Sequence, residues 1–136
     1  MGRTRGAVAA GHQITAEAAA EILKEGGNAF DATLAALFAS CVAEPVLASL
    51  GGGGFLLAHS AQGTPILYDF FTQTPRRKQP LREVDFHPIV ADFGAAQQEF
   101  HIGIGSIPTP GLVKGIFQIH SDLCRLPLST IIQPPC

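Results

Sequence analysis

Four consecutive glycines, Gly51 to Gly54, lead directly into the apolar run Phe55–Ala58 and constrain the fold more than any other stretch. Ordering four glycines costs more backbone entropy than ordering any other four residues. Such a segment indicates that backbone must approach another group closely or adopt positive φ. The sequence has neither the G-x-G-x-x-G pattern before a helix nor a Gly-Lys-Ser/Thr loop, so a packing or turn role is favoured over nucleotide binding.

The size and composition of the chain are those of one apolar domain. At 136 residues it falls within the usual range of a single domain. Its net charge of −2 favours neither a nucleic acid nor a membrane surface as a partner. Because 46% of the residues are hydrophobic and only 15% are charged, we expect the chain to bury surface against a partner or a continuation. Residues 1–136 are therefore predicted to be a single partial domain, truncated at the C-terminus.

The first fifty residues are predicted to form a short strand and two helices. Residues 6–11 have the pattern of a buried strand, and Thr15 is a plausible N-cap for a helix that stops at Gly26-Gly27. Asn28 then caps a second helix, Ala29–Ala43, with Asp31 as the acid of a capping box. This second helix is apolar nearly all round, so we expect it to be buried between layers.

The rest of the chain alternates strand and helix patterns. Phe55–His59 and Pro65–Phe71 are separated by a five-residue loop with a glycine, which predicts an antiparallel hairpin. Residues 100–105 alternate like a strand, and Thr109 with Pro110 is predicted to open a helix that reaches Leu123. A further element begins near Leu128. Mixed helices and antiparallel strands indicate an α+β or layered α/β class.

No pattern of cysteines and histidines indicates a metal site, and we expect no cofactor. The cysteines are three, Cys41, Cys124 and Cys136, an odd number without a C-x-x-C. The five histidines are scattered, so hydrogen bonding is the default role for each. At the two ends of the apolar helix, capping by Asp31 and a hydrogen-bonded strand entry at Glu44 are favoured over acid–base chemistry.

Several segments together resemble the N-terminal part of γ-glutamyltransferases. The resemblance extends over almost the whole chain from Gly6 onward, and its pieces keep their order and spacing. These pieces are Ala16–Ala18, Ile22–Ala32, Glu44-Pro45, Gly51–Phe55, Pro110-Gly111 with Gly115, and Leu126–Leu128. The "GGNAxDA" and "GGGGF" segments are the most specific of them.

This resemblance implies a four-layer αββα sandwich of the N-terminal nucleophile hydrolase type. In that family a precursor cleaves itself ahead of a threonine, whose amino group serves as base while its hydroxyl attacks a γ-glutamyl amide such as glutathione. The γ-glutamyl group then passes to water or an amino acceptor. No threonine of this chain is followed by histidine, as the family nucleophile is. The implied partners are thus the missing C-terminal part or small subunit and, in the complete enzyme, a γ-glutamyl substrate.

One departure from the family pattern concerns the substrate. The family places an arginine after the hairpin strand, in an R-E-T-A-P context, to hold the α-carboxylate of the γ-glutamyl group. Phe71 occupies that position here, so a charge-assisted hydrogen bond of about 1.5–3 kcal/mol is missing. The predicted substrate-binding residues are Phe71, Thr72, Gln73, Arg76 and Arg77. One of the two arginines is the candidate to hold the carboxylate instead.

An alternative interpretation is a catalytically inactive truncated remnant or an interaction fragment that associates through an unfinished sheet. An open sheet edge and an apolar composition favour association over solubility. The basic start, residues 1–6, is followed by an apolar run of only four residues, too short for a signal-peptide core. A cytoplasmic location is favoured on that ground.

Overall fold

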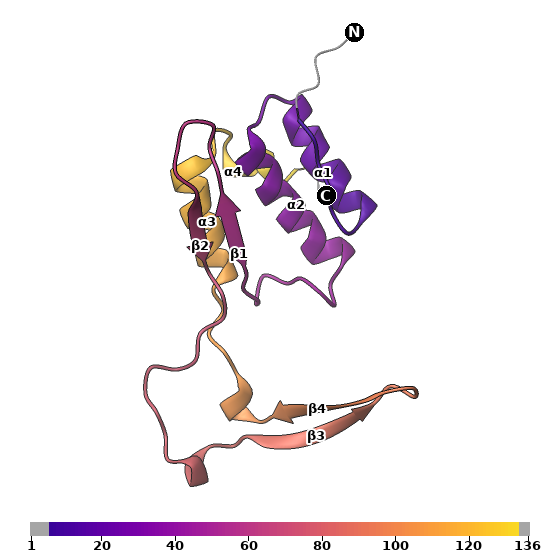
Figure 1. The fold of residues 1–136 in the computed structure, drawn as a ribbon, viewed down its shortest axis with the longest axis vertical. Helices are drawn as coiled ribbons and strands as arrows, with labels where there is room; N and C mark the ends of the chain where they lie inside the picture. The colour runs from indigo at the N-terminus through magenta and orange to yellow at the C-terminus, as the bar shows by residue number, and fades with distance from the viewer. Residues whose placement is uncertain (1–5, 134–136) are drawn as a thin grey trace. The chain divides into compact units, whose positions relative to one another are not determined.

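The computed structural model of the chain describes residues 6–133 and divides it into two compact units (Figure 1). The first unit contains the described residues up to Phe71 and from Pro110 onward, and the second is Thr72–Thr109. The sequence segments that make up the first unit are therefore interrupted by the second.

The first unit combines four helices with a two-stranded antiparallel sheet. Its elements are α1 (Gln13–Lys24), α2 (Ala29–Ala43), β1 (Phe55–Ala58), β2 (Ile66–Asp69), α3 (Leu112–Leu123) and α4 (Leu128–Ile131). Figure 1 shows α1 and α2 side by side, and α2 also packs against α3 and α4. The side chains that are almost fully buried come from these four helices and form one core: Ile22, Leu34, Ile116, Ile119 and Ile131.

The β1–β2 hairpin packs one face on this core and leaves the other face exposed. Leu56, Tyr68 and Phe70 pack against the buried cluster. On the opposite face Leu57 is 69% exposed and Leu67, its partner across the ladder, is 61% exposed. The hairpin prediction is confirmed, and so is the mixed α+β class. Among the described residues the hairpin has helices on one side only, so the four-layer sandwich stays a prediction.

The second helix is confirmed with its predicted bounds and its predicted cap. The Asn28 side-chain oxygen accepts from the N–H groups of Phe30 and Asp31, at 2.8 and 2.9 Å, and Asp31 Oδ2 accepts from the Asn28 N–H at 2.7 Å. Gly26 has φ of 97°, which ends the preceding helix as expected. Burial of α2 is less complete than predicted, since Val42 near its end is 69% exposed.

Three predictions near the helix starts are wrong. Residues 6–11 form no strand, because no strand of the described chain pairs with them; they run exposed beside α1. The N-cap of α1 is His12, whose Nδ1 accepts from the Ile14 N–H, and Thr15 is buried inside the helix. Thr109 does not cap α3: its backbone pairs with Gln73, and the helix begins after Gly111.

The second unit is a β-hairpin with two 3₁₀ turns at its base. Its elements are η1 (Leu81–Glu83), β3 (His87–Asp92), β4 (Gln97–Ile102) and η2 (Ile104–Ser106). The strands pair in register from His87 opposite Ile102 to Asp92 opposite Gln97. The strand predicted for residues 100–105 therefore begins earlier and stops at Gly103, where φ of 108° turns the chain into η2. No residue of this unit falls in the buried class.

No helix among residues 6–133 combines the length and the apolar character that a membrane crossing requires.

Candidate substrate-binding site

Phe71 ends the β1–β2 hairpin and presents an aromatic surface. Its N–H donates to Asp69 Oδ1 at 3.0 Å. Its ring stacks on Phe55, with the ring centres 5.3 Å apart and the planes 10° from parallel, and half of the residue is exposed. A stacked phenyl pair offers contact area and π-faces but no cation. Position 71 therefore cannot hold a carboxylate by charge.

The glycine segment, Gly51–Gly54, holds the backbone next to Phe71 through hydrogen bonds. The Gly52 carbonyl oxygen accepts from the N–H groups of Gly111 and Leu112, each at 3.1 Å, and so satisfies two N–H groups at the start of α3. Gly54 continues the hairpin ladder by pairing with Phe70 in both directions, at 3.1 and 3.3 Å. The predicted close approach of the glycine backbone is confirmed, whereas positive φ occurs at none of the four.

Two further glycines, both on the α3 side, hold Phe70 in place. A Cβ atom at Gly111 would overlap the Phe70 carbonyl oxygen, and one at Gly115 would overlap the Phe70 ring. The end of β2 and the start of α3 can touch only because neither position carries a side chain. The backbone that leads into Phe71 is therefore held by close packing between β2 and α3.

The other predicted substrate-binding residues are Thr72, Gln73, Arg76 and Arg77. They belong to the second unit, whereas Phe71 belongs to the first, so they are described separately from Phe71. Gln73 exchanges two backbone hydrogen bonds with Thr109, at 3.0 and 2.7 Å. Thr72 is half-buried, and Arg76 and Arg77 are exposed. Arg77 lines a hollow of about 480 Å³, together with Gln79, Glu83, Asp85 and four further residues.

The acidic side chains of this hollow were not predicted. Glu83 is in η1, and Asp85 follows η1 in the chain. No pattern in the sequence indicated that these two carboxylates line the same hollow as Arg77. Asp85 Oδ2 accepts from the Ile104 N–H at 3.0 Å, and the Asp85 carbonyl accepts from Gly105 at 2.7 Å. These contacts cross about twenty residues of hairpin. Only the register of β3 and β4 could have indicated them.

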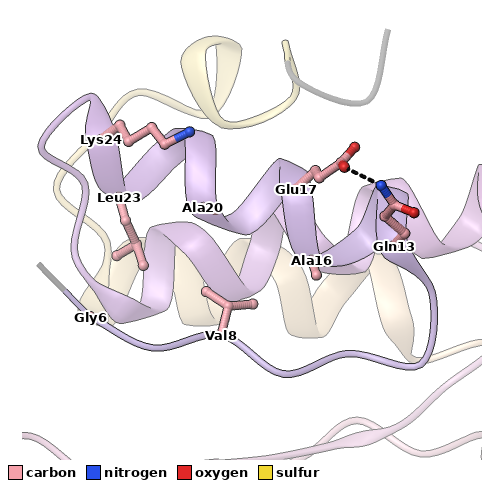
Figure 2. A pocket seen from close by; sticks show the side chains of 8 residues that line it. All are labelled: Gly6, Val8, Gln13, Ala16, Glu17, Ala20, Leu23 and Lys24. Atoms are coloured by element: carbon pink, nitrogen blue, oxygen red, sulfur yellow. Dashed lines mark hydrogen bonds between the residues drawn. The ribbon is translucent and has the colours of Figure 1, made fainter. Parts of the chain in front are cut away.

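A second hollow, of about 590 Å³, lies along the outer side of α1 (Figure 2). Ala16, Ala20 and Leu23 give it an apolar floor. At its rim Gln13 donates to Glu17 at 2.7 Å. Glu17 and Lys24 also line this hollow, but its lining includes no histidine, cysteine, serine or threonine side chain.

The buried carboxylate of Asp31 is structural. Besides capping α2, its Oδ1 accepts from the N–H groups of Arg125 and Leu126 at 3.0 and 3.1 Å. The cap was predicted, but the tie to the chain after α3 was not. Burial, the charge of Asp31 and a hydrogen bond to it raise the pKa of Cys124 to about 12. The Cys124 thiol therefore stays protonated at neutral pH and is no nucleophile.

The remaining candidate groups also have structural partners. Glu44 ends α2 and accepts from the Thr15 hydroxyl at 3.3 Å; it leads into a turn, so the predicted strand entry is wrong. Burial raises the pKa of Cys41. Cys136 and the basic start before Gly6 lie outside the described residues. Within residues 6–133 no three His, Cys, Asp or Glu side chains gather as a metal site.

The fold of the chain matches that of solved gamma-glutamyltranspeptidases. It superposes on the gamma-glutamyltranspeptidase from Pseudomonas nitroreducens, solved as a complex with L-DON, with a TM-score of 0.76 and 32% identity, covering 96% of this chain and 37% of that one. The family model described as gamma-glutamyltranspeptidase matches residues 15–136. The chain belongs to the gamma-glutamyltranspeptidase family.

Two curated relatives extend this comparison. The glutathione hydrolase proenzyme of Pseudomonas aeruginosa is 33% identical over 95% of this chain and 22% of its own length. The acylase ACY 1 proenzyme of Pseudomonas sp. (strain V22) is 31% identical over 96% of this chain and 24% of its own length. The chain thus spans about a quarter of the length of these relatives.

Proposed function

We propose that this chain is the N-terminal part of the large subunit of a γ-glutamyltransferase-like hydrolase. In the complete enzyme, an N-terminal threonine supplied by other polypeptide attacks an amide, and the acyl group passes to water or to an amino acceptor. The observation that carries the proposal is the joint agreement of fold and sequence with a gamma-glutamyltranspeptidase over 96% of the chain. The proposal includes the four-layer sandwich, whose second sheet would cover the exposed face of β1 and β2.

The exposed face of the hairpin supports this assignment. Phe55, Leu57 and Leu67 are each more than half exposed on one side of a sheet whose other side is packed. Sheets that pack face to face interdigitate such residues in a core about 10 Å thick. A second sheet is the natural cover for a surface of this kind.

We further propose that the donor is held differently from glutathione in the typical family member. Position 71 is rigidly placed and aromatic, so it offers no charge to an α-carboxylate. The basic run after the hairpin supplies Arg76 and Arg77 as alternative partners for that group. A relative of similar identity is named an acylase, not a glutathione hydrolase, which supports a donor other than glutathione.

The test uses the protein made from the complete reading frame that contains this chain. Hydrolysis of γ-glutamyl-p-nitroanilide and of glutathione is measured for the wild type and for Arg76→Ala and Arg77→Ala. If one arginine holds the carboxylate, its removal should lower kcat/KM about tenfold or more, the worth of a charge-assisted hydrogen bond. The matched control is Lys78→Ala in the same basic run.

Ordinary turnover that neither arginine substitution changes would remove both arginines from the donor site. Absence of turnover with any γ-glutamyl or other acyl amide would instead favour the inactive remnant. A complete reading frame without a Thr-His segment would do the same.

A further inference from the structure

We infer that the exposed loop 74–80 is a cleavage site for an endoprotease that recognises paired basic residues, and that the cut chain stays folded as two associated pieces. The bond that breaks is the peptide C–N bond between Arg77 and Lys78. Water supplies a hydroxyl group to the carbonyl carbon of Arg77 and a proton to the nitrogen of Lys78. The inference is independent of the proposed function, because it treats the chain as a substrate and not as a catalyst.

The sequence offers one site to such a protease. The run Arg76-Arg77-Lys78 is the only place in the 136 residues where basic residues adjoin. The other basic residues of the described chain stand singly: Lys24 in α1, Arg82 in η1, Lys114 in α3 and Arg125 after α3. Two adjacent acidic pockets select the run over single basic residues, because each charged side chain adds its own charge-assisted contacts.

The loop has no regular structure to hold it. Residues 74–80 lie between the bridge at Gln73 and the turn η1, and every one of them is exposed. Within the described part of the chain, residues 74–79 form no hydrogen bond, and the three basic side chains form no ion pair. Exposed backbone of this kind opens at little free-energy cost and is the preferred site of proteolytic nicking.

Two prolines favour the backbone shape that a protease binds. Pro75 and Pro80 flank the run, and a proline biases the residue before it toward extended backbone. Extended peptides bind through main-chain hydrogen bonds to a strand edge, while pockets for their side chains give specificity. A cut after Lys78 would place Pro80, which has no N–H, two residues beyond the broken bond. The bond after Arg77 is therefore favoured within the run.

The first unit survives the cut because it is built from both sides of the loop. The elements α1, α2, β1 and β2 precede the cut, and α3 and α4 follow it (Figure 1). The buried core joins Leu34, from before the cut, to Ile116 and Ile131, from after it. None of these side chains belongs to the loop, so hydrolysis leaves their packing unchanged.

Buried polar contacts tie the same two pieces together. Asp31 Oδ1 accepts from the N–H groups of Arg125 and Leu126 at 3.0 and 3.1 Å. The Asn28 side chain donates to the Leu123 carbonyl oxygen at 2.8 Å. Separation of the pieces would leave these groups without their partners as well as expose the core, and both changes oppose separation.

The test digests the 136-residue chain with a small amount of trypsin and, in parallel, with a subtilisin-like endoprotease specific for paired basic residues. Mass spectrometry identifies the cuts. Among residues 6–133 we expect trypsin to cut first within the basic run, and the second protease to cut after Arg77. The two pieces should leave a size-exclusion column together, at the position of the uncut chain, with the same far-UV circular dichroism. They should separate in urea.

Matched variants test recognition of the pair. Arg77→Gln leaves no adjacent basic residues and should slow cutting by the paired-basic protease about tenfold or more, the worth of a charge-assisted contact. The control is Arg82→Gln, an exposed arginine of η1 outside the run, which should be cut at the wild-type rate.

Three results would overturn the inference. The first is an initial trypsin cut at Lys24, Arg82, Lys114 or Arg125. The second is an unchanged rate for Arg77→Gln with the paired-basic protease, or an equal slowing for Arg82→Gln. The third is a cut chain whose pieces separate or lose their helical signal without urea. A parent protein that turns over no acyl amide would refute only the proposed function, since none of these measurements depends on activity.

Discussion

The two units of the molecule are stabilised in different ways. The first unit buries side chains from four helices in one core, and five of these side chains are essentially inaccessible. The second unit has no residue in the buried class and is held by the β3–β4 ladder, by its turns and by ring contacts such as Phe86 on His101, 4.5 Å apart. A two-stranded hairpin without a packed face is marginal in water. The first unit is therefore expected to carry the stability of the chain.

The largest expected difference comes from truncating one apolar side chain in each unit. Leu34→Ala removes a fully buried side chain and should lower the free energy of unfolding by about 2–5 kcal/mol. Val90→Ala shortens a side chain on β3 that is 64% exposed, and it should change the free energy of unfolding by less than about 1 kcal/mol. Urea denaturation followed by far-UV circular dichroism measures both. Equal effects would show that the hairpin shares the core.

Removal of the Asp31 carboxylate should be nearly as damaging. Asp31→Ala removes a fully buried carboxylate and leaves the partly buried N–H groups of Asn28, Arg125 and Leu126 without their acceptor, so it should lower the free energy of unfolding by about 3 kcal/mol. Asp122→Ala is the control, because this carboxylate is exposed and pairs with Tyr68 and Gln118 at the surface. A loss for Asp31→Ala no larger than for Asp122→Ala would contradict the account.

Glycine substitutions separate close packing from backbone strain. Gly115→Ala places a methyl group on the Phe70 ring and should destabilise the first unit by about 1–3 kcal/mol, although alanine is the better helix former. Gly94→Ala has open space around it and suffers only from φ of 83°, about 1–2 kcal/mol. Calorimetric melting measures both variants. A stabilised Gly115→Ala variant would mean that β2 and α3 do not touch as described.

The smallest expected effect is a pH response of the hairpin turn. The N–H of Gly94 and the side chain of Gln97 hold the pKa of Asp92 below its usual value. A lowered folded-state pKa contributes stability above the ordinary carboxyl pKa and loses it as the pH falls through the lowered value. The Gly94 amide shift, followed by NMR, should therefore titrate below the ordinary Asp range and should stop titrating in Asp92→Asn. A midpoint at or above that range would contradict the turn geometry.

The same division explains which features the sequence could predict. The first two helices of the first unit are specified locally, by the Gly26 stop and the Asn28 cap, and both predictions were confirmed. Residues 6–11 look like a strand by composition, but a strand also requires a partner, which local pattern cannot supply. The prediction that Thr15 is an N-cap was wrong, because its hydroxyl donates to Glu44, 29 residues away, and not to the start of the helix.

The candidate site was predictable only in part. Phe71 follows from its place after the hairpin, and its aromatic contact with Phe55 is a consequence of strand register. The strand β3 was missed, because Pro88 and the mostly exposed side chains around it give no clean alternation. Without β3 there was no register to bring Asp85 beside Ile104, so the acidic side of the hollow was missed too.

The most direct test of the central claim is the substitution Phe71→Arg in the protein made from the complete reading frame. If phenylalanine at position 71 is the reason that the α-carboxylate of glutathione lacks a cationic partner, the variant should raise kcat/KM for glutathione about tenfold or more. Phe71→Leu is the uncharged control. The account is contradicted if wild type already hydrolyses glutathione efficiently and Phe71→Arg changes nothing. It is equally contradicted if the 136-residue chain alone shows amidase turnover.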